Sequence, residues 1–136
     1  MRKTWVEKRE LDKEYQVKIN PKKFADIPTG TTMLVPTPKM VDEYVRNISQ
    51  GSFVYMKQIR QELAIHYHAE MTCPVVTGIS LRIISEAAFE EYQTDQILDT
   101  ITPFWRVVDP DSKLASKLAC GVDFIVELQI QEGIEL

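Results

Sequence analysis

The tripeptide Pro36-Thr37-Pro38 marks the most definite helix start in this chain. A threonine side chain caps a helix well, and proline fits the first helical position, where its missing N–H is not needed. Apolar side chains then recur at the i, i+3, i+4, i+7 spacing, at Val41, Tyr44, Val45 and Ile48. This spacing predicts an amphipathic helix that begins at Pro38, buries one stripe in a core and stops at Gly51.

The remaining patterns predict further elements in a definite order. Apolar spacing and breaks predict three more helices, over 56–67, 75–92 and 122–133. Short apolar runs predict strands at 31–35, 101–108 and 113–118. Three helices followed by strand–turn–strand is the order of a winged helix-turn-helix. We therefore expect an α/β fold, mostly α-helical, over residues 31–136, with a small β wing and a C-terminal helix.

Residues 1–30 read as a charged amino-terminal arm with at most one short helix. The chain has a net charge of −4, but residues 1–26 hold eight Lys/Arg and five acids, a net of +3. The remaining residues therefore carry −7. Such an arm contacts phosphate or is a solvated tail, and its interleaved acids favour the tail.

A chain of 136 residues is expected to form one domain around its own core. No apolar run approaches the ~20 residues of a membrane span, and the charged start lacks a secretory apolar segment. These features predict a cytoplasmic protein that does not bind a membrane. Its two cysteines, Cys73 and Cys120, are then expected to be free thiols.

The run from Ile101 to Val108 combines β-prone residues with Pro103 and two adjacent aromatics. Its apolar character predicts a buried strand. Proline removes a ladder N–H, however, and buried Trp105 and Arg106 would each need a polar partner. The combination predicts a strand whose side chains turn toward a pocket.

The frame Pro103-Phe104-Trp105-Arg106-Val107 resembles the Pro-Cys-His-Arg-Val motif of the DNA-repair alkyltransferases that act on O6-alkylguanine. Phe104 stands at the acceptor cysteine and Trp105 at the histidine. Lys113-Leu114 and Cys120-Gly121 are similar to later family motifs, and the segment 122–133 resembles the family's last helix, ending in Glu132-Gly133. The segment 41–78 has the outline of its helix-turn-helix, so the resemblance covers residues 36–133.

This resemblance implies a protein that does not transfer alkyl groups. Transfer needs a thiolate activated by a histidine that a carboxylate orients, and only the carboxylate, Glu132, remains. No catalytic residue, cofactor or metal is expected. Phe104 and Trp105 either stack a flipped base or fill the core of a lost site, and the sequence leaves both open. The candidate pocket residues are Met56, Val75, Phe104, Trp105, Arg106 and Glu132.

The resemblance places DNA recognition on the helix 75–92, but the family's base-flipping residues are missing. Val75 takes the place of the intercalating arginine, and Met56 that of the tyrosine that pushes the phosphate. Three acids of this helix are expected at its solvated end, away from any groove: Glu86, Glu90 and Glu91. The candidate DNA contacts are Lys57, Arg60, Thr77, Ser80 and Arg82.

His66-x-His68 with Cys73 holds three residue types that bind zinc. Two histidines at i, i+2 do not share a helix face, so a site requires the helix to end before His68. Half-exposed histidines at a helix end are the default interpretation. Cys73 precedes the helix 75–92, where it is either a reactive thiol or a small buried cap.

Three hypotheses follow for function. The first is a non-catalytic DNA-binding protein of the alkyltransferase-like kind, which recognises alkylated or damaged DNA. The second is a protein-interaction or scaffold domain that kept the fold but lost DNA binding. The third, least favoured, is an enzyme or redox sensor that works through Cys73.

Overall fold

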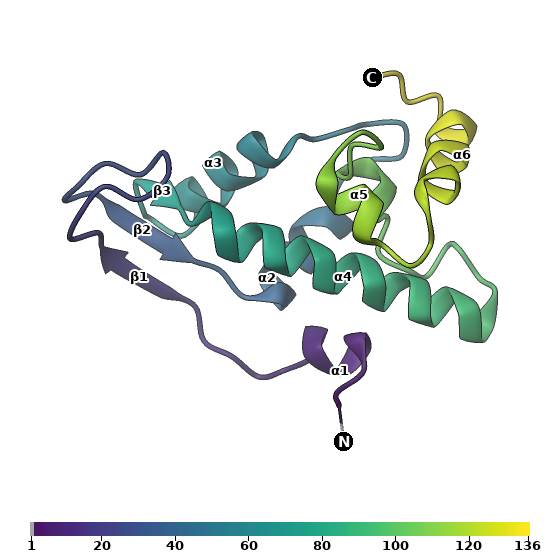
Figure 1. Cartoon of the computed structure of the whole chain (residues 1–136), viewed down its shortest axis with the longest axis horizontal. Coiled ribbons are helices and arrows are strands. Elements are labelled where there is room, and N and C mark those ends of the chain that lie inside the picture. The colour runs from purple at the N-terminus through teal and green to yellow at the C-terminus, as the bar shows by residue number, and fades with distance from the viewer. Residues whose placement is uncertain (1) are drawn as a thin grey trace.

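Helix α4 (Pro74–Asp95) is the longest element, and four of the other helical segments of the chain pack against it: α1 (Trp5–Arg9), α2 (Pro38–Arg46), α3 (Met56–His66) and the 3-10 helix η1 (Phe104–Arg106) (Figure 1). The computed structural model describes residues 2–136. The other elements are β1 (Gln16–Ile19), β2 (Thr32–Val35), β3 (Met71–Thr72), α5 (Lys113–Lys117) and α6 (Val122–Glu132). The fold is thus mixed α/β and mostly helical, as the sequence predicts.

The three strands form one small sheet in the order β1-β2-β3. β1 and β2 are an antiparallel pair, with Val17 opposite Leu34 and Ile19 opposite Thr32. β3 pairs in parallel with β2 after the chain has passed through α2 and α3. The sequence predicts β2, but β1 lies within the segment read as an arm.

Four predicted helices are confirmed, and two of their ends show why. The Thr37 side chain accepts a hydrogen bond from the Met40 N–H, with Pro38 at the first helical position of α2. α6 ends at Gly133, whose left-handed backbone (φ 75°) suits glycine.

The wing predicted between residues 101 and 118 is wrong. The N–H groups of Val107 and Val108 both donate to the Phe104 carbonyl, at 3.1 and 3.0 Å, so this run coils into η1. Residues 101–105 are all buried, and consecutive burial does not fit a strand with one buried face. The residues predicted as the second wing strand form α5, because the Ser112 side chain accepts from the Ala115 N–H and caps it.

The amino-terminal segment is not a solvated tail, because α1 is fastened to α4. Both Glu90 oxygens accept the first N–H groups of α1, from Trp5 and Val6, at 3.1 and 3.0 Å. Buried Arg9 donates to both oxygens of Glu91, at 2.7 and 3.2 Å.

Glu86, the third acid on α4, is also engaged inside the protein. It is buried and accepts the Ala119 N–H at 3.0 Å. The expectation that Glu86, Glu90 and Glu91 lie at a solvated helix end is therefore wrong.

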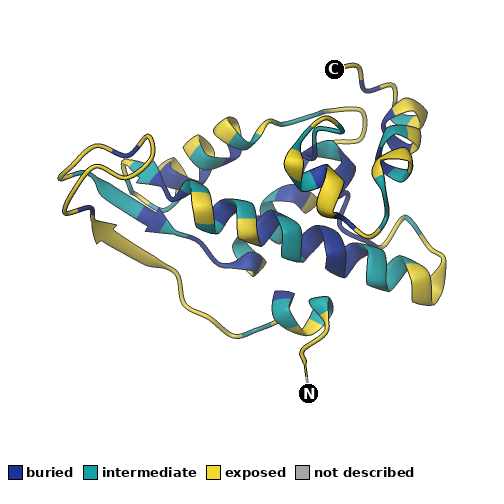
Figure 2. Ribbon diagram, viewed as in Figure 1, coloured by how far each residue is buried: buried dark blue, intermediate teal, exposed yellow. Residues whose placement is uncertain are grey.

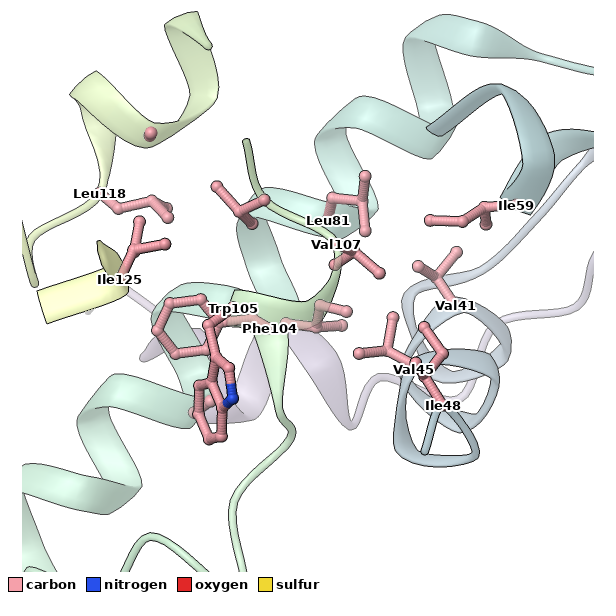
Figure 3. Close-up of a cluster of buried hydrophobic side chains, with 14 of the residues drawn as sticks. Val41, Val45, Ile48, Ile59, Leu81, Phe104, Trp105, Val107, Leu118 and Ile125 are labelled. Carbon is pink, nitrogen blue, oxygen red and sulfur yellow. The ribbon is translucent and has the colours of Figure 1, made fainter. Parts of the chain in front are cut away.

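The core lies between α2, α3, α4, η1 and α6. Figure 2 shows the buried residues concentrated along the helices, while β1 and most of the loop after it are exposed. Figure 3 shows side chains from these elements meeting around η1, among them Val41, Ile59, Leu81, Phe104 and Ile125. η1 is therefore a central part of the core.

Replacing Thr37 by alanine should lower the free energy of unfolding by about 1 kcal/mol. The change removes the acceptor for the Met40 N–H at a buried helix start. Urea denaturation measures the loss, with exposed Thr29→Ala as the matched control. Equal stability of the two variants would contradict the capping role.

Candidate functional site

Glu132 is the centre of a hydrogen-bond network that joins η1, α6 and the loop between α2 and α3. Its Oε2 accepts from Trp105 Nε1 at 2.7 Å and from an Arg106 terminal nitrogen at 2.9 Å. Its Oε1 accepts from Arg106 Nε at 2.9 Å and from the Gly51 N–H at 3.0 Å. The other terminal nitrogen of Arg106 donates to the Ile48 carbonyl at 2.8 Å. This carboxylate and guanidinium therefore have several partners each, in a paired bidentate geometry.

The backbone of the α2–α3 loop and that of η1 both lie close to α6 around this network. Gly51 has φ 86°, and a Cβ there would lie 3.3 Å from the Glu132 carbonyl oxygen. Glycine therefore permits both the left-handed turn and the contact with the end of α6. On the other side, buried Gln129 donates to the carbonyls of Trp105 and Val108, at 2.9 and 3.0 Å. Two polar residues of α6 thus hold η1 in place.

The pKa of Glu132 is lowered from its ordinary value of 4.5. Burial raises the pKa, but hydrogen bonds from Arg106, the Gly51 N–H and Trp105 outweigh that effect, together with the charge of Arg106. The carboxylate is therefore ionised at neutral pH.

The lowered pKa predicts a pH dependence of stability. A carboxylate whose pKa is lower when folded stabilises the protein above its unfolded pKa, and this contribution is lost as pH falls through the folded pKa. The wild-type free energy of unfolding should therefore fall more steeply between about pH 5 and pH 3 than that of Glu132→Gln. Urea denaturation across this range measures both slopes. Parallel slopes would show that Glu132 does not couple to folding.

The two aromatic residues at the centre of the resemblance lie in the core. Phe104 is 0% exposed, stacks on Phe124 with 6.2 Å between ring centroids, and meets Trp105 edge-on. Trp105 is 4% exposed and its indole N–H is already bonded to Glu132. Of the two alternatives that the sequence leaves open, this geometry matches rings that fill a core.

A cavity of about 450 Å³ adjoins the network, between the end of α2, the segment before η1 and α6. Trp105, Arg106 and Glu132 line it, together with Arg46 and Asp99. Three of the six predicted pocket residues are thus together. Phe104, Met56 and Val75 do not line this cavity, and Val75 is half exposed on the first turn of α4.

A second cavity, of about 500 Å³, lies between α2 and α3 and is lined by none of the predicted pocket or DNA-contact residues, although His66 of the zinc interpretation lines it. Its charged lining is acidic, from Glu43 and Glu62, and the Tyr44 hydroxyl donates to Glu62. Burial raises the pKa of Tyr44, as does its hydrogen bond to that carboxylate.

The predicted DNA contacts do not form one exposed surface. Thr77 and Ser80 are buried, and the Thr77 hydroxyl donates to the Cys73 carbonyl at 2.7 Å within α4. These two residues were wrongly predicted to face DNA, because they lie on the core side of the helix.

The three predicted cations have different surroundings. Arg60 donates to both Asp26 oxygens, at 2.9 and 2.7 Å, and to the Thr72 carbonyl. The Arg82 guanidinium lies over the Trp5 ring, at 5.4 Å, and its Nε is 3.9 Å from Glu86. Lys57 is exposed. Two of the three cations are thus engaged within the protein.

The metal and thiol interpretations gain no support from the geometry. Residues 2–136 contain no group of three or more His, Cys, Asp or Glu side chains placed to hold a metal ion. Cys73 is a buried cap of α4, and both cysteines are free. Burial raises the pKa of Cys120 to about 11, so its thiol is protonated at neutral pH.

Two members of the network, Gly51 and Gln129, were missed by the sequence interpretation. The sequence predicts Gly51 as a helix stop, which does not indicate its hydrogen bond to Glu132. Gln129 is a polar residue beside buried Leu128, and because polar residues that flank the apolar stripe of a helix are usually solvated, the sequence carries no signal of its burial.

Comparisons with known proteins do not assign this chain to a family. No family model, no curated protein and no solved structure matches it. Within residues 2–136, every helix is too short or too polar to cross a bilayer.

Proposed function

We propose that this chain is a non-catalytic protein-interaction domain, related to the O6-alkylguanine alkyltransferases but with a closed acceptor site. The observation that carries the proposal is the burial of Phe104, which is 0% exposed where the acceptor cysteine would stand. A phenyl ring cannot accept an alkyl group, and a ring in the core cannot stack on a flipped base. The hydrogen bond from Trp105 to Glu132 supports the relationship, because it joins the histidine and carboxylate positions of the family's motif.

The surroundings of the candidate cations favour a protein partner over DNA. Nucleic-acid affinity depends largely on lysine and arginine side chains that neutralise phosphates. Arg60 and Arg82 already face acids of this chain, and residues 27–136 are strongly acidic overall. The exposed residues on the first turns of α4 are apolar instead, Val75 and Ile79, at 52% and 54% exposure.

Fluorescence anisotropy with labelled duplexes tests the proposal. Plain DNA and DNA containing O6-methylguanine should both show no saturable binding at low salt, and mass spectrometry should find no alkyl group on the protein. Purification after nuclease treatment should retain a protein partner in fixed stoichiometry. Salt-dependent duplex binding that Lys57→Ala weakens would overturn the proposal.

DNA binding without alkyl transfer is the second candidate, and one observation favours it. The acids of α4 that would repel phosphate are engaged inside the protein, by α1 and by the Ala119 N–H. Exposed lysines on and after β1 would then supply the cations, at positions 18, 22 and 23. The same anisotropy experiment separates the two candidates.

A further inference from the structure

The outer edge of β1 is open, and its backbone groups are available for pairing. β1 is the first strand in the sheet order and has a neighbour on one side only (Figure 1). The Asn20 N–H donates to the Thr31 carbonyl, so residues 16, 18 and 20 direct their backbone groups toward β2. Val17 and Ile19 therefore direct theirs outward. Within residues 2–136, no backbone group pairs with them there.

Two apolar side chains of β1 extend the core-facing side of the sheet to its outer edge. Val17 lies opposite Leu34, which is 0% exposed in the core, so both side chains are on the same face. Ile19 follows on that face because strand residues alternate. Val17 is 43% and Ile19 72% exposed, and Figure 2 shows the whole of β1 as exposed. The core face thus continues to an edge where its apolar side chains are partly exposed.

The charge of this edge is positive. Residues 13–23 carry four lysines and one glutamate, and all five side chains are exposed. Lys18 lies on the face opposite Val17, in the middle of the strand. The others flank the strand, at Lys13 and Glu14 before it and at Lys22 and Lys23 after it.

We infer that the open edge of β1 binds an extended peptide segment of a partner protein in which apolar and acidic residues alternate. The segment adds a fourth strand to the sheet. Its apolar side chains continue the row of Leu34 and Val17, and its acidic side chains lie beside Lys18 on the other face. The inference rests on the proposed function and names the surface and the partner chemistry. A second copy of this chain is disfavoured, because edge-to-edge pairing would bring two lysine-rich segments together.

Titration with a capped peptide of alternating valine and glutamate tests this assignment. Isothermal titration calorimetry should show saturable binding of the peptide. In NMR spectra recorded during the titration, the backbone amide resonances of Val17 and Ile19 should shift more than those of other residues. Val17→Pro should weaken binding by about tenfold or more, because it removes an outward N–H that the β1–β2 ladder does not use. Val17→Thr is the matched control, because it keeps the N–H, and it should bind nearly as well as the wild type.

A second variant keeps the test valid if proline disturbs the strand. Lys18→Glu combined with Lys22→Glu changes only exposed side chains and should shift the preference to a valine–lysine peptide. Absence of binding by the valine–glutamate peptide would overturn the inference. So would equal binding by Val17→Pro with the fold intact, or a concentration-dependent dimer that Val17→Pro abolishes.

The two proposals fail in different ways. If the peptide does not bind and duplex DNA does not bind either, the edge assignment is wrong and the interaction domain remains. If the lysines of the edge bind duplex DNA instead of the peptide, with strong salt dependence, both proposals are wrong.

Discussion

Replacing Glu132 by alanine should lower the free energy of unfolding by about 3 kcal/mol or more. The side chains of Glu132 and Arg106 are 9% and 14% exposed, so the change leaves a nearly buried guanidinium without its counter-ion. It also leaves the Trp105 indole N–H without an acceptor in a residue that is 4% exposed. Urea denaturation at neutral pH measures the loss.

Glu127→Ala is the matched control, because Glu127 is exposed on the same helix and its loss should cost about 0.5 kcal/mol or less. A double replacement by apolar residues, Arg106→Met with Glu132→Leu, should cost less than Glu132→Ala, since no unpaired charge remains. If Glu132→Ala and Glu127→Ala are equally stable, the network does not hold α6 to η1.

Replacing Phe104 by alanine should be the most destabilising single change, at about 4 kcal/mol. The ring is completely buried beside Trp105 (Figure 3) and also stacks on Phe124. Truncation therefore creates a cavity that the surrounding helices fill only in part. Thermal and urea denaturation measure the loss, and Phe24→Ala, at 40% exposure, should cost about 1 kcal/mol or less.

Phe104→Cys tests the closed site directly. A thiol at this position should react with iodoacetamide only after denaturant is added, because the native side chain has no contact with solvent. The native cysteines are replaced by serine in the background so that a single thiol is followed. Rapid labelling of the folded variant would mean that the acceptor position is open, which would remove the observation behind the proposed function.

The regular helices were predictable because local signals and burial agree in them. Thr37 and Pro38 begin α2 as predicted, and the stripe that includes Val41 and Val45 is buried. Gly133 ends α6 as predicted. Where capping, periodicity and core contacts all favour one element, the sequence defines it well.

The two strands predicted in the segment 101–118 are absent. In the first of them, the β-prone composition reflects complete burial of successive residues and not the alternation of a strand. Residues 101–105 are buried one after another, which a period of two cannot describe, and a 3-10 turn satisfies the backbone instead. For α5, the turn expected between the two wing strands contains Ser112, which is also a good helix cap.

The network around Glu132 was predictable only in part. The resemblance brings together Trp105, Arg106 and Glu132, and the structure places all three in hydrogen-bond contact. The resemblance did not indicate that the Phe104 and Trp105 rings are buried. Their burial depends on contacts with α6, from Phe124 and Gln129. Strand β1 was missed because its Val17-Lys18-Ile19 alternation is short and lies among charges.

The bond between Glu132 and the Gly51 N–H joins positions 81 residues apart, and it has a consequence for synthesis on the ribosome. A nascent chain that stops short of α6 holds Arg106 with no counter-ion and presents the Trp105 ring to water. Helices α2 and α3 both contact α4 directly and can pack early, whereas Trp105 and Arg106 of η1 gain their carboxylate partner only when the last turn of α6 has left the exit tunnel. An arrested chain that lacks α6 should therefore be bound by chaperones and degraded faster than a chain that includes it.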